Sequence, residues 1–163
     1  MKSIASGSSF KMGTLCALMV LYLLASLGWA EEGREATATS YVERGISFAK
    51  RGELELAIAD FRIALQFDPN SAAAYCNRAD LYYRRGDYQK ALGDYNRAIE
   101  INPTLSAAYT NRGGVRFLLR DLDGCIRDHN RALQLNPRLP EAYHNRGLAR
   151  HDQGDLDGAT RGF

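Results

Sequence analysis

The sequence is poor in the residues from which most active sites are built. Three histidines and three cysteines occur among the 163 residues, and they form no Cys–His or Ser–His–Asp order typical of nucleophilic catalysis. A glycine-rich phosphate-binding loop is also absent. His144 and His151 lie seven residues apart, which does not match the i, i+4 spacing of a helical zinc site. We therefore expect a protein that is not an enzyme and that uses no cofactor or metal ion.

An excess of charge of one sign is missing as well. The chain has 21 basic and 19 acidic residues. Residues 1–30 contain two of the lysines and no acidic residue, so the remainder carries 19 residues of each sign. A balanced charge does not favour binding to nucleic acid. We expect protein partners instead.

Residues 1–30 differ from the rest of the chain. Lys2 and Lys11 precede an apolar run from Leu15 to Leu27, which ends in Gly-Trp-Ala before the first acidic residues. This order is typical of a secretory signal peptide. The apolar run is shorter than the ~20 residues that span a bilayer, so we expect cleavage after Ala30. The protein would then be extracytoplasmic, in a bacterial periplasm. The alternative is an uncleaved anchor, with residues 12–30 tethering the protein to the inner membrane and the domain facing the periplasm.

One short sequence motif, which we call the tyrosine–arginine phrase, recurs through the remaining chain. It reads YVERGI, YCNRAD, YTNRGG and YHNRGL, and its tyrosines are 34 residues apart at Tyr41, Tyr75, Tyr109 and Tyr143. Self-similarity at a fixed period of this length indicates a repeat architecture. We expect a flexible linker at 31–37, followed by a domain over 38–163. The domain divides into repeats 38–71, 72–105, 106–139 and a partial repeat 140–163.

Each repeat contains two helical patterns separated by turn signals. In the second repeat Tyr75, Ala79 and Tyr82 lie at i, i+4 and i+7, on one stripe of a helix. Glycine is expected to end the first helix, at Gly52, Gly86 and Gly154. An aspartate follows as the expected N-cap of the second helix, at Asp87, Asp121 and Asp155. Proline stops the second helix at Pro69, Pro103 and Pro137.

These repeated positions resemble the tetratricopeptide repeat, whose pattern runs aromatic, small, aromatic, Gly, Ala, aromatic, Ala and Pro. The resemblance covers essentially all of 38–163 and implies an all-α, right-handed solenoid of helix-turn-helix hairpins, with three full repeats and a truncated fourth. The positions that carry it are Tyr41, Gly45, Phe48, Ala57, Phe61, Pro69, Tyr75, Tyr82, Gly86, Ala91, Tyr95, Pro103, Tyr109, Gly113, Pro137, Tyr143 and Gly147.

The later repeats depart from this pattern. Arg116 replaces an aromatic residue, and we expect its stem to cover apolar surface while its head reaches water. His129 stands at a core aromatic position and is expected to be a packed imidazole. Arg120 replaces the helix-ending glycine. Cys125 occupies an alanine position, so we expect it and Cys76 to be free thiols.

The arginine of the recurring phrase is followed by an aspartate sixteen residues later in three repeats, as Arg44 and Asp60, Arg78 and Asp94, and Arg112 and Asp128. One interpretation is an ion pair that ties the two helices of a repeat together. The other is two separate solvated charges, because exposed pairs contribute only about 0–1 kcal/mol. The sequence leaves both open.

The resemblance implies that the first helix of each repeat lines a concave surface. Positions one, five and eight residues after the repeat tyrosine share one face of that helix, and position nine lies beside it. The candidate groove residues are Val42, Ile46, Lys50, Cys76, Asp80, Tyr83, Arg84, Thr110, Phe117, Leu118, His144, Leu148 and His151. Tyr83 and Phe117 would be aromatic anchors for a partner, with Lys50 and Arg84 beside them. Alternatively, these side chains pack between neighbouring repeats.

We expect an exported, non-enzymatic scaffold or adaptor that binds a peptide or helix of a partner protein in this groove. Some family members clamp the C-terminal carboxylates of a chaperone with lysine and asparagine. Here Asn77 matches one clamp position, whereas Val42 and Ile46 stand where the first repeat needs Lys and Asn. Alternatives are a dedicated periplasmic chaperone for one client, or a truncated gene product without an independent role. The C-terminal end of the repeat stack is expected to be open. Another copy of the chain could cover it, which would lead to self-association.

Overall fold

The computed structural model describes Gly33 and residues 37–154. In this part of the chain the regular structure is α-helical. Residues 37–50 form the first helix, and six more follow: α2 (Leu54–Phe67), α3 (Ala72–Arg85), α4 (Tyr88–Ile101), α5 (Ser106–Leu118), α6 (Leu122–Leu135) and α7 (Pro140–Asp152). The predicted all-α arrangement of helical hairpins is confirmed.

Several predictions concern residues outside the described part. The signal peptide or anchor at 1–30 and the end of the fourth repeat at 155–163 are among them. Gly33 and Thr37 belong to the stretch that we expected to be a flexible linker, but both are helical. The Thr37 hydroxyl donates a hydrogen bond to the Gly33 carbonyl oxygen at 2.7 Å. The linker over 31–37 as a whole stays a prediction.

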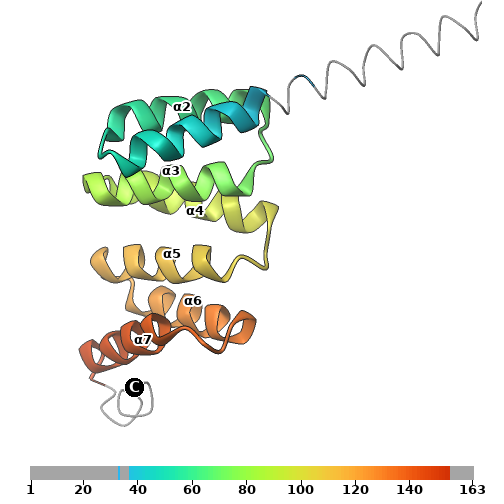
Figure 1. Ribbon diagram of the computed structural model, residues 1–163. Coiled ribbons are helices and arrows are strands. Elements are labelled where there is room, and N and C mark those ends of the chain that lie inside the picture. Colours follow the sequence, from blue (N-terminus) through green and yellow to red (C-terminus); the bar gives the residue numbers. More distant parts are fainter. Residues whose placement is uncertain (1–32, 34–36, 155–163) are drawn as a thin grey trace, which may run out of the picture.

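The helices stack in sequence order (Figure 1). Helix α3 packs against α2 and α4, α5 packs against α4 and α6, and α7 packs against α6. Each hairpin therefore contacts the hairpins before and after it, as expected for repeats in which each unit buries its apolar face against its neighbours. Contacts of α3 with α5 and of α5 with α7 bring the first helices of successive repeats together.

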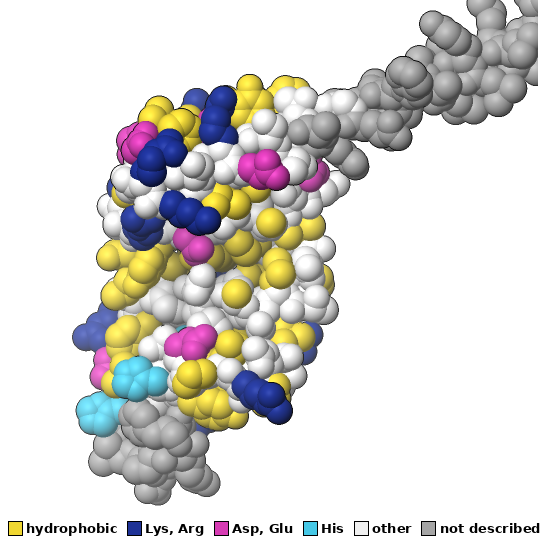
Figure 2. All heavy atoms as spheres, viewed as in Figure 1, with side chains coloured by type: hydrophobic (Ala, Val, Ile, Leu, Met, Phe, Trp, Pro, Cys, Tyr) yellow, Lys and Arg dark blue, Asp and Glu magenta, His cyan; other side chains and the backbone are white. Residues whose placement is uncertain are grey.

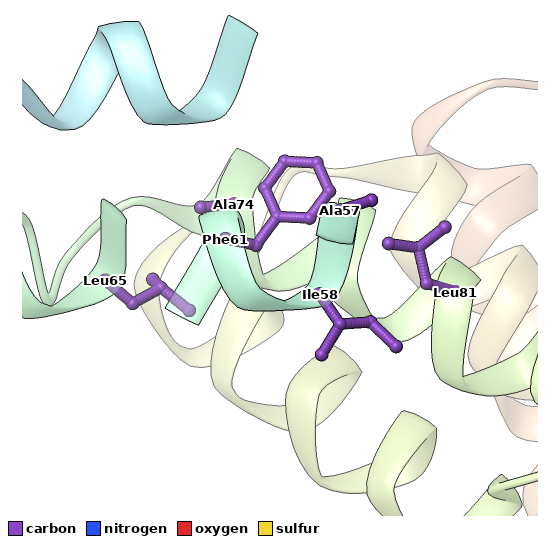
Figure 3. Packing of buried hydrophobic residues seen from close by; sticks show 6 residues of the cluster. All are labelled: Ala57, Ile58, Phe61, Leu65, Ala74 and Leu81. Carbon is purple, nitrogen blue, oxygen red and sulfur yellow. The ribbon is translucent and has the colours of Figure 1, made fainter. Parts of the chain in front are cut away.

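Small residues lie next to large apolar side chains in the interior. Figure 3 shows Phe61, with its neighbours Ala57, Ile58 and Leu65 on α2, beside Ala74 and Leu81 of α3. Ala57 is fully buried, and a Cβ added to Gly45 would lie 3.2 Å from the Phe61 ring. Small residues at these positions therefore allow the helices of one repeat to approach closely. The repeated signature residues form the packing contacts of the fold.

The first helix of each repeat ends in a left-handed residue. Gly52, Gly86 and Gly154 have φ angles of +81°, +86° and +83°, as predicted for helix-ending glycines. The third repeat has Arg120 at this place, and its φ is +64°. The backbone thus keeps the same turn although an L-residue adopts it only at a cost in free energy.

The predicted N-caps behave differently from one another. The Asp121 carboxylate accepts a hydrogen bond from the Gly124 backbone N–H at 2.9 Å, so this cap is confirmed. Asp87 is the N-cap residue of α4, as predicted, but its side chain makes no capping hydrogen bond. Its carboxylate instead pairs with Arg85 and, at 3.2 Å, with Lys90. The Arg85 guanidinium is the main reason that the pKa of Asp87 is lowered. Asp155 lies outside the described residues.

None of the helices in the described part of the chain is both long and apolar enough to cross a bilayer.

Candidate partner-binding groove

The recurring tyrosine–arginine phrase joins the two helices of each of the first three repeats. Arg78 donates from Nε to Asp94 Oδ2 at 2.7 Å and from NH2 to Asp94 Oδ1 at 2.8 Å. The same two-point contact joins Arg44 to Asp60 and Arg112 to Asp128. The three aspartates are 2–8% exposed. The hypothesis of an ion pair within the repeat is confirmed, and the alternative of separate solvated charges is wrong.

The arginine also lies over the tyrosine that precedes it. The distance from the guanidinium carbon to the ring centroid is 5.6 Å for Arg78 and Tyr75 and 5.4 Å for Arg112 and Tyr109. Such contacts add attraction between the cation and the aromatic face. The phrase is thus architectural and leaves the rest of the first helix free for other contacts.

Sequence reasoning missed two contacts of these arginines. Asn96 accepts a hydrogen bond from Arg112 NH1, and Asn130 accepts one from Arg146 NH1, both at 2.8 Å. Each asparagine precedes its arginine by sixteen residues, so it belongs to the preceding repeat. The equal spacing on both sides of the arginine was the signal in the sequence. These bonds connect one repeat to the next.

The prediction for the side chain of Arg116 was wrong. We expected its head to reach water, but NH1 lies 2.9 Å from Asp128 Oδ2. The aromatic residue that this position usually holds would leave Asp128 with one arginine, whereas here two arginines share it. A nearby buried carboxylate therefore attracts the guanidinium away from solvent.

Several of the predicted groove residues are exposed on the first helices of the repeats. Among the exposed large hydrophobic side chains are Tyr83, Leu118 and Leu148, at 43%, 45% and 37% exposure. Phe117 is half-buried, and Lys50, Arg84, His144 and His151 are exposed. In Figure 2 basic side chains gather at the upper left, hydrophobic side chains lie below them, and histidines appear at the lower end. The face is therefore chemically uneven along the stack.

A recess lies between residues 37–50 and α3, and predicted groove residues surround it. Its lining includes Ile46, Lys50, Asp80 and Arg84, together with Asn77. Arg84 NH1 donates to the Ala49 carbonyl oxygen at 3.4 Å, which links the ends of the two first helices. The structure thus brings together four of the predicted groove residues.

Asp80 is held in this recess by two other helices. Its Oδ1 atom accepts a hydrogen bond from Asn111 Nδ2 of α5 at 3.0 Å and another from the Tyr95 hydroxyl of α4. Burial raises the pKa of Asp80, while these hydrogen bonds and the charge of Arg84 act in the opposite direction. The position of this carboxylate is therefore fixed by the stacking of two repeats.

Other predicted groove residues serve packing. Thr110 is only 7% exposed and donates to the Ser106 carbonyl oxygen at 3.1 Å, so we remove it from the groove surface. Val42 and Cys76 pack against core clusters. Burial raises the pKa of the Cys76 thiol to about 11. Cys76 and Cys125 are free thiols, as predicted.

His129 is a packed imidazole, as predicted. It is fully buried, its Nδ1 atom lies 2.8 Å from the Cys125 carbonyl oxygen, and burial lowers its pKa. In the described residues, no group of three or more His, Cys, Asp or Glu side chains could hold a metal ion.

Comparisons with known proteins agree with this arrangement. A family model described as tetratricopeptide repeat matches residues 72–105. A second model, described as TPR repeat, matches residues 45–86 and 115–154. The first TPR of Spaghetti (RPAP3), solved bound to the HSP90 peptide SRMEEVD, is 28% identical, with 74% of this chain and 95% of that chain covered and a TM-score of 0.72.

Two further structures have similar folds. MamA is 25% identical, with 77% of this chain and 74% of that chain covered and a TM-score of 0.75. The Arabidopsis OM64 TPR domain is 24% identical, with 73% and 98% covered and a TM-score of 0.71. No curated protein matches the chain significantly. The family matches cover more than half of the sequence, and the chain belongs to the tetratricopeptide-repeat family.

Proposed function

We propose that this protein is a non-enzymatic scaffold or adaptor that binds a peptide or helix of a partner protein across its first helices. Tetratricopeptide-repeat domains are generally protein–protein interaction modules. The observation that carries the proposal is the exposure of Tyr83, Leu118 and Leu148 on successive first helices. None of the three belongs to the repeated signature that builds the fold.

The physical argument is the free energy of covering these side chains. Removing apolar surface from water contributes ~25 cal/mol per Å², and a few anchors carry most of the affinity at interfaces. Phe117 lies beside Leu118 on α5, so an incoming segment would meet two aromatic rings and two aliphatic side chains. A segment that covers this row would gain affinity without displacing any signature residue.

The partner differs in chemistry from the peptide bound to the Spaghetti domain. In this chain Val42 and Ile46 occupy the positions where the terminal-carboxylate clamp needs Lys and Asn. Both pack against the first hydrophobic cluster, so they cannot provide the polar contacts of that clamp. We therefore do not extend the HSP90 peptide to this protein.

The test is binding of the full chain to an array of peptides, compared with the double variant Tyr83→Ala and Phe117→Ala. Truncation of two anchors should weaken binding by roughly tenfold or more. The control is Leu56→Ala, because Leu56 is 50% exposed but lies on α2, a second helix. Equal binding by the double variant and the parent protein would contradict the groove assignment.

We also propose export to the bacterial periplasm, supported only by the order of charge, apolar run and small residues in 1–30. The intact mass of the protein purified from its native envelope tests this directly. The mass of a chain that begins at Glu31 would agree with cleavage. The mass of a chain that retains residues 1–30 would contradict cleavage.

A further inference from the structure

At one equivalent position of the first helices, the charge of the side chain changes from repeat to repeat. The residue nine positions after each repeat tyrosine is Lys50, Arg84, Leu118 and Asp152 in turn. All four are exposed. Because the repeats stack in sequence order, equivalent positions form a row along the groove. This row runs from two cations, through an apolar side chain, to a carboxylate.

The two ends of the row differ in how their charges are neutralised. Asp152 accepts a hydrogen bond from Arg120 NH1 at 3.0 Å. Neither Lys50 nor Arg84 forms an ion pair with another residue in the described part of the chain, although their sequence neighbours Arg51 and Arg85 do. Positive charge is therefore left available at the end of the groove formed by the first two repeats.

The helix dipole does not explain this pair of cations. Basic residues are favoured near the C-terminal end of a helix, and Lys50 and Arg84 occupy such ends. The same position in the other two repeats holds Leu118 and Asp152, so the fold does not require a cation there. The identity of these residues is therefore available for recognition.

The recess beside the cations contains a single acidic side chain. Asp80 lines it together with Lys50, Arg84 and the Asn77 amide. Its Oδ1 atom accepts hydrogen bonds from Tyr95 and Asn111, which hold the carboxylate toward α4 and α5. One acid against two cations leaves a net positive recess, with an additional amide side chain that can donate a hydrogen bond.

We propose that this recess binds a side-chain carboxylate of the partner segment, held by Lys50 and Arg84, and that an apolar residue of the same segment lies on Tyr83 and Leu118. The inference rests on the proposed function and deepens it, since it names the chemistry and the direction of the bound segment. Lys50 and Arg84 lie at the ends of their helices, and Ile46 lines the same recess as an apolar side chain. The contacts to the carboxylate would therefore come from these two cations and not from a Lys and Asn at the positions of Val42 and Ile46.

The fold also fixes the spacing of the two features in the ligand. Packed helices lie about 8–10 Å apart, and an extended chain advances ~3.3 Å per residue. An acidic residue at Arg84 and an apolar residue at Leu118 would therefore be separated by about three residues. A segment with this spacing would cross the first helices of the second and third repeats.

The experiment is selection of a random nine-residue peptide library, displayed on phage, against the full chain. Enriched peptides should carry Asp or Glu about three residues from Leu, Phe or Tyr. In fluorescence anisotropy with a synthetic enriched peptide, replacing its acidic residue by the amide should weaken binding roughly tenfold, a typical effect of losing a charged contact. The double variant Lys50→Glu and Arg84→Glu should reverse the preference toward basic peptides.

Controls separate this inference from the proposed function. Arg127→Glu changes an exposed charge on α6 and should leave binding unchanged. Lys50→Gln and Arg84→Gln give a milder pair, expected to weaken binding and to reduce its salt dependence. Peptides that need Tyr83 and Phe117 but show no acidic preference would overturn the carboxylate site and leave the groove in place. Absence of any enriched peptide, or binding unaffected by the Tyr83 and Phe117 substitutions, would overturn both.

Discussion

Two adjacent glycines of α5 should respond in opposite directions to the same substitution. A Cβ added at Gly113 would lie 2.5 Å from Cε1 and 2.7 Å from Nδ1 of the His129 ring. A Cβ added at Gly114 would meet nothing within 4 Å. The imidazole cannot move easily, because it is fully buried and its Nδ1 atom is hydrogen-bonded to the Cys125 carbonyl oxygen. Gly113→Ala therefore forces a shift in the core, whereas Gly114→Ala does not.

The magnitudes follow from two terms. Alanine is favoured over glycine in a helix by about 0.8–1.0 kcal/mol, and this gain applies to both variants. Overpacking a core costs about 1–3 kcal/mol, and this cost applies to Gly113→Ala alone. Gly114→Ala should thus raise the free energy of unfolding by about 1 kcal/mol. The free energy of unfolding of Gly113→Ala should be about 2 kcal/mol lower than that of Gly114→Ala. The effect of the substitution on the unfolded chain is the same in both and cancels in the comparison.

Urea unfolding of the full chain, followed by far-ultraviolet circular dichroism, measures this difference through the midpoint and the slope of the transition. Equal midpoints for the two variants, or a higher midpoint for Gly113→Ala, would refute the close approach of α5 to α6 at His129. A raised midpoint for Gly114→Ala would also show that the variant retains the fold, so it serves as the matched control.

Three further predictions concern individual contacts. A double-mutant cycle on Arg78 and Asp94, whose side chains are 16% and 11% exposed, should give a coupling of about 2 kcal/mol in urea unfolding, because two charge-assisted hydrogen bonds are lost. Arg120→Gly should raise the free energy of unfolding by about 0.5–1 kcal/mol, since the left-handed backbone at φ +64° favours glycine. Burial lowers the pKa of His129, so the unfolded chain takes up a proton that the folded chain does not, and stability falls as the pH drops below ~6.5. His129→Phe should remove this loss, measured as a smaller difference in Tm between about pH 7.5 and pH 5.5.

Each of these predictions has a matched comparison in another repeat. The Arg44–Asp60 pair should couple less than Arg78–Asp94, because the Arg44 side chain is 57% exposed; equal couplings would show that burial is not the cause. Gly86→Ala should destabilise the protein by ~1 kcal/mol at φ +86°, and a neutral result would contradict the argument for Arg120. Phe61 beside Gly45 shows that a phenyl ring fits at the position of His129. An unchanged pH dependence in His129→Phe would assign the acid sensitivity to other groups.

The local features of the fold could be read from the sequence because they recur within one repeat. The 34-residue period located the helices, and Gly52 and Gly86 ended them as expected. The sixteen-residue spacing of Arg78 and Asp94 pointed to their ion pair. Asp87 takes the predicted N-cap position, but its carboxylate pairs with Arg85, which also pairs with Glu55 of the preceding repeat, and forms no capping hydrogen bond. The capping propensity of aspartate does not indicate that competing ion pair.

The candidate site could be predicted only as a set of helix positions. Helical periodicity placed Lys50, Arg84 and Thr110 on one face of the first helices, yet Thr110 is buried while the two cations are exposed. Helical periodicity gives the face on which a residue lies, but it does not say how much of that face other side chains cover in the folded stack.

The amino-acid sequence by itself determined the repeating hairpin and its turns, because these depend on residues a fixed and short distance apart. It offered the pairing of Arg78 with Asp94 as one of two interpretations, and the structure decided between them. Only the tertiary structure decided that Asn111 of the third repeat holds Asp80 of the second, and that Lys50 and Arg84 share one recess. Those contacts depend on the rotation and distance between stacked hairpins, which are set by the packing of many side chains together.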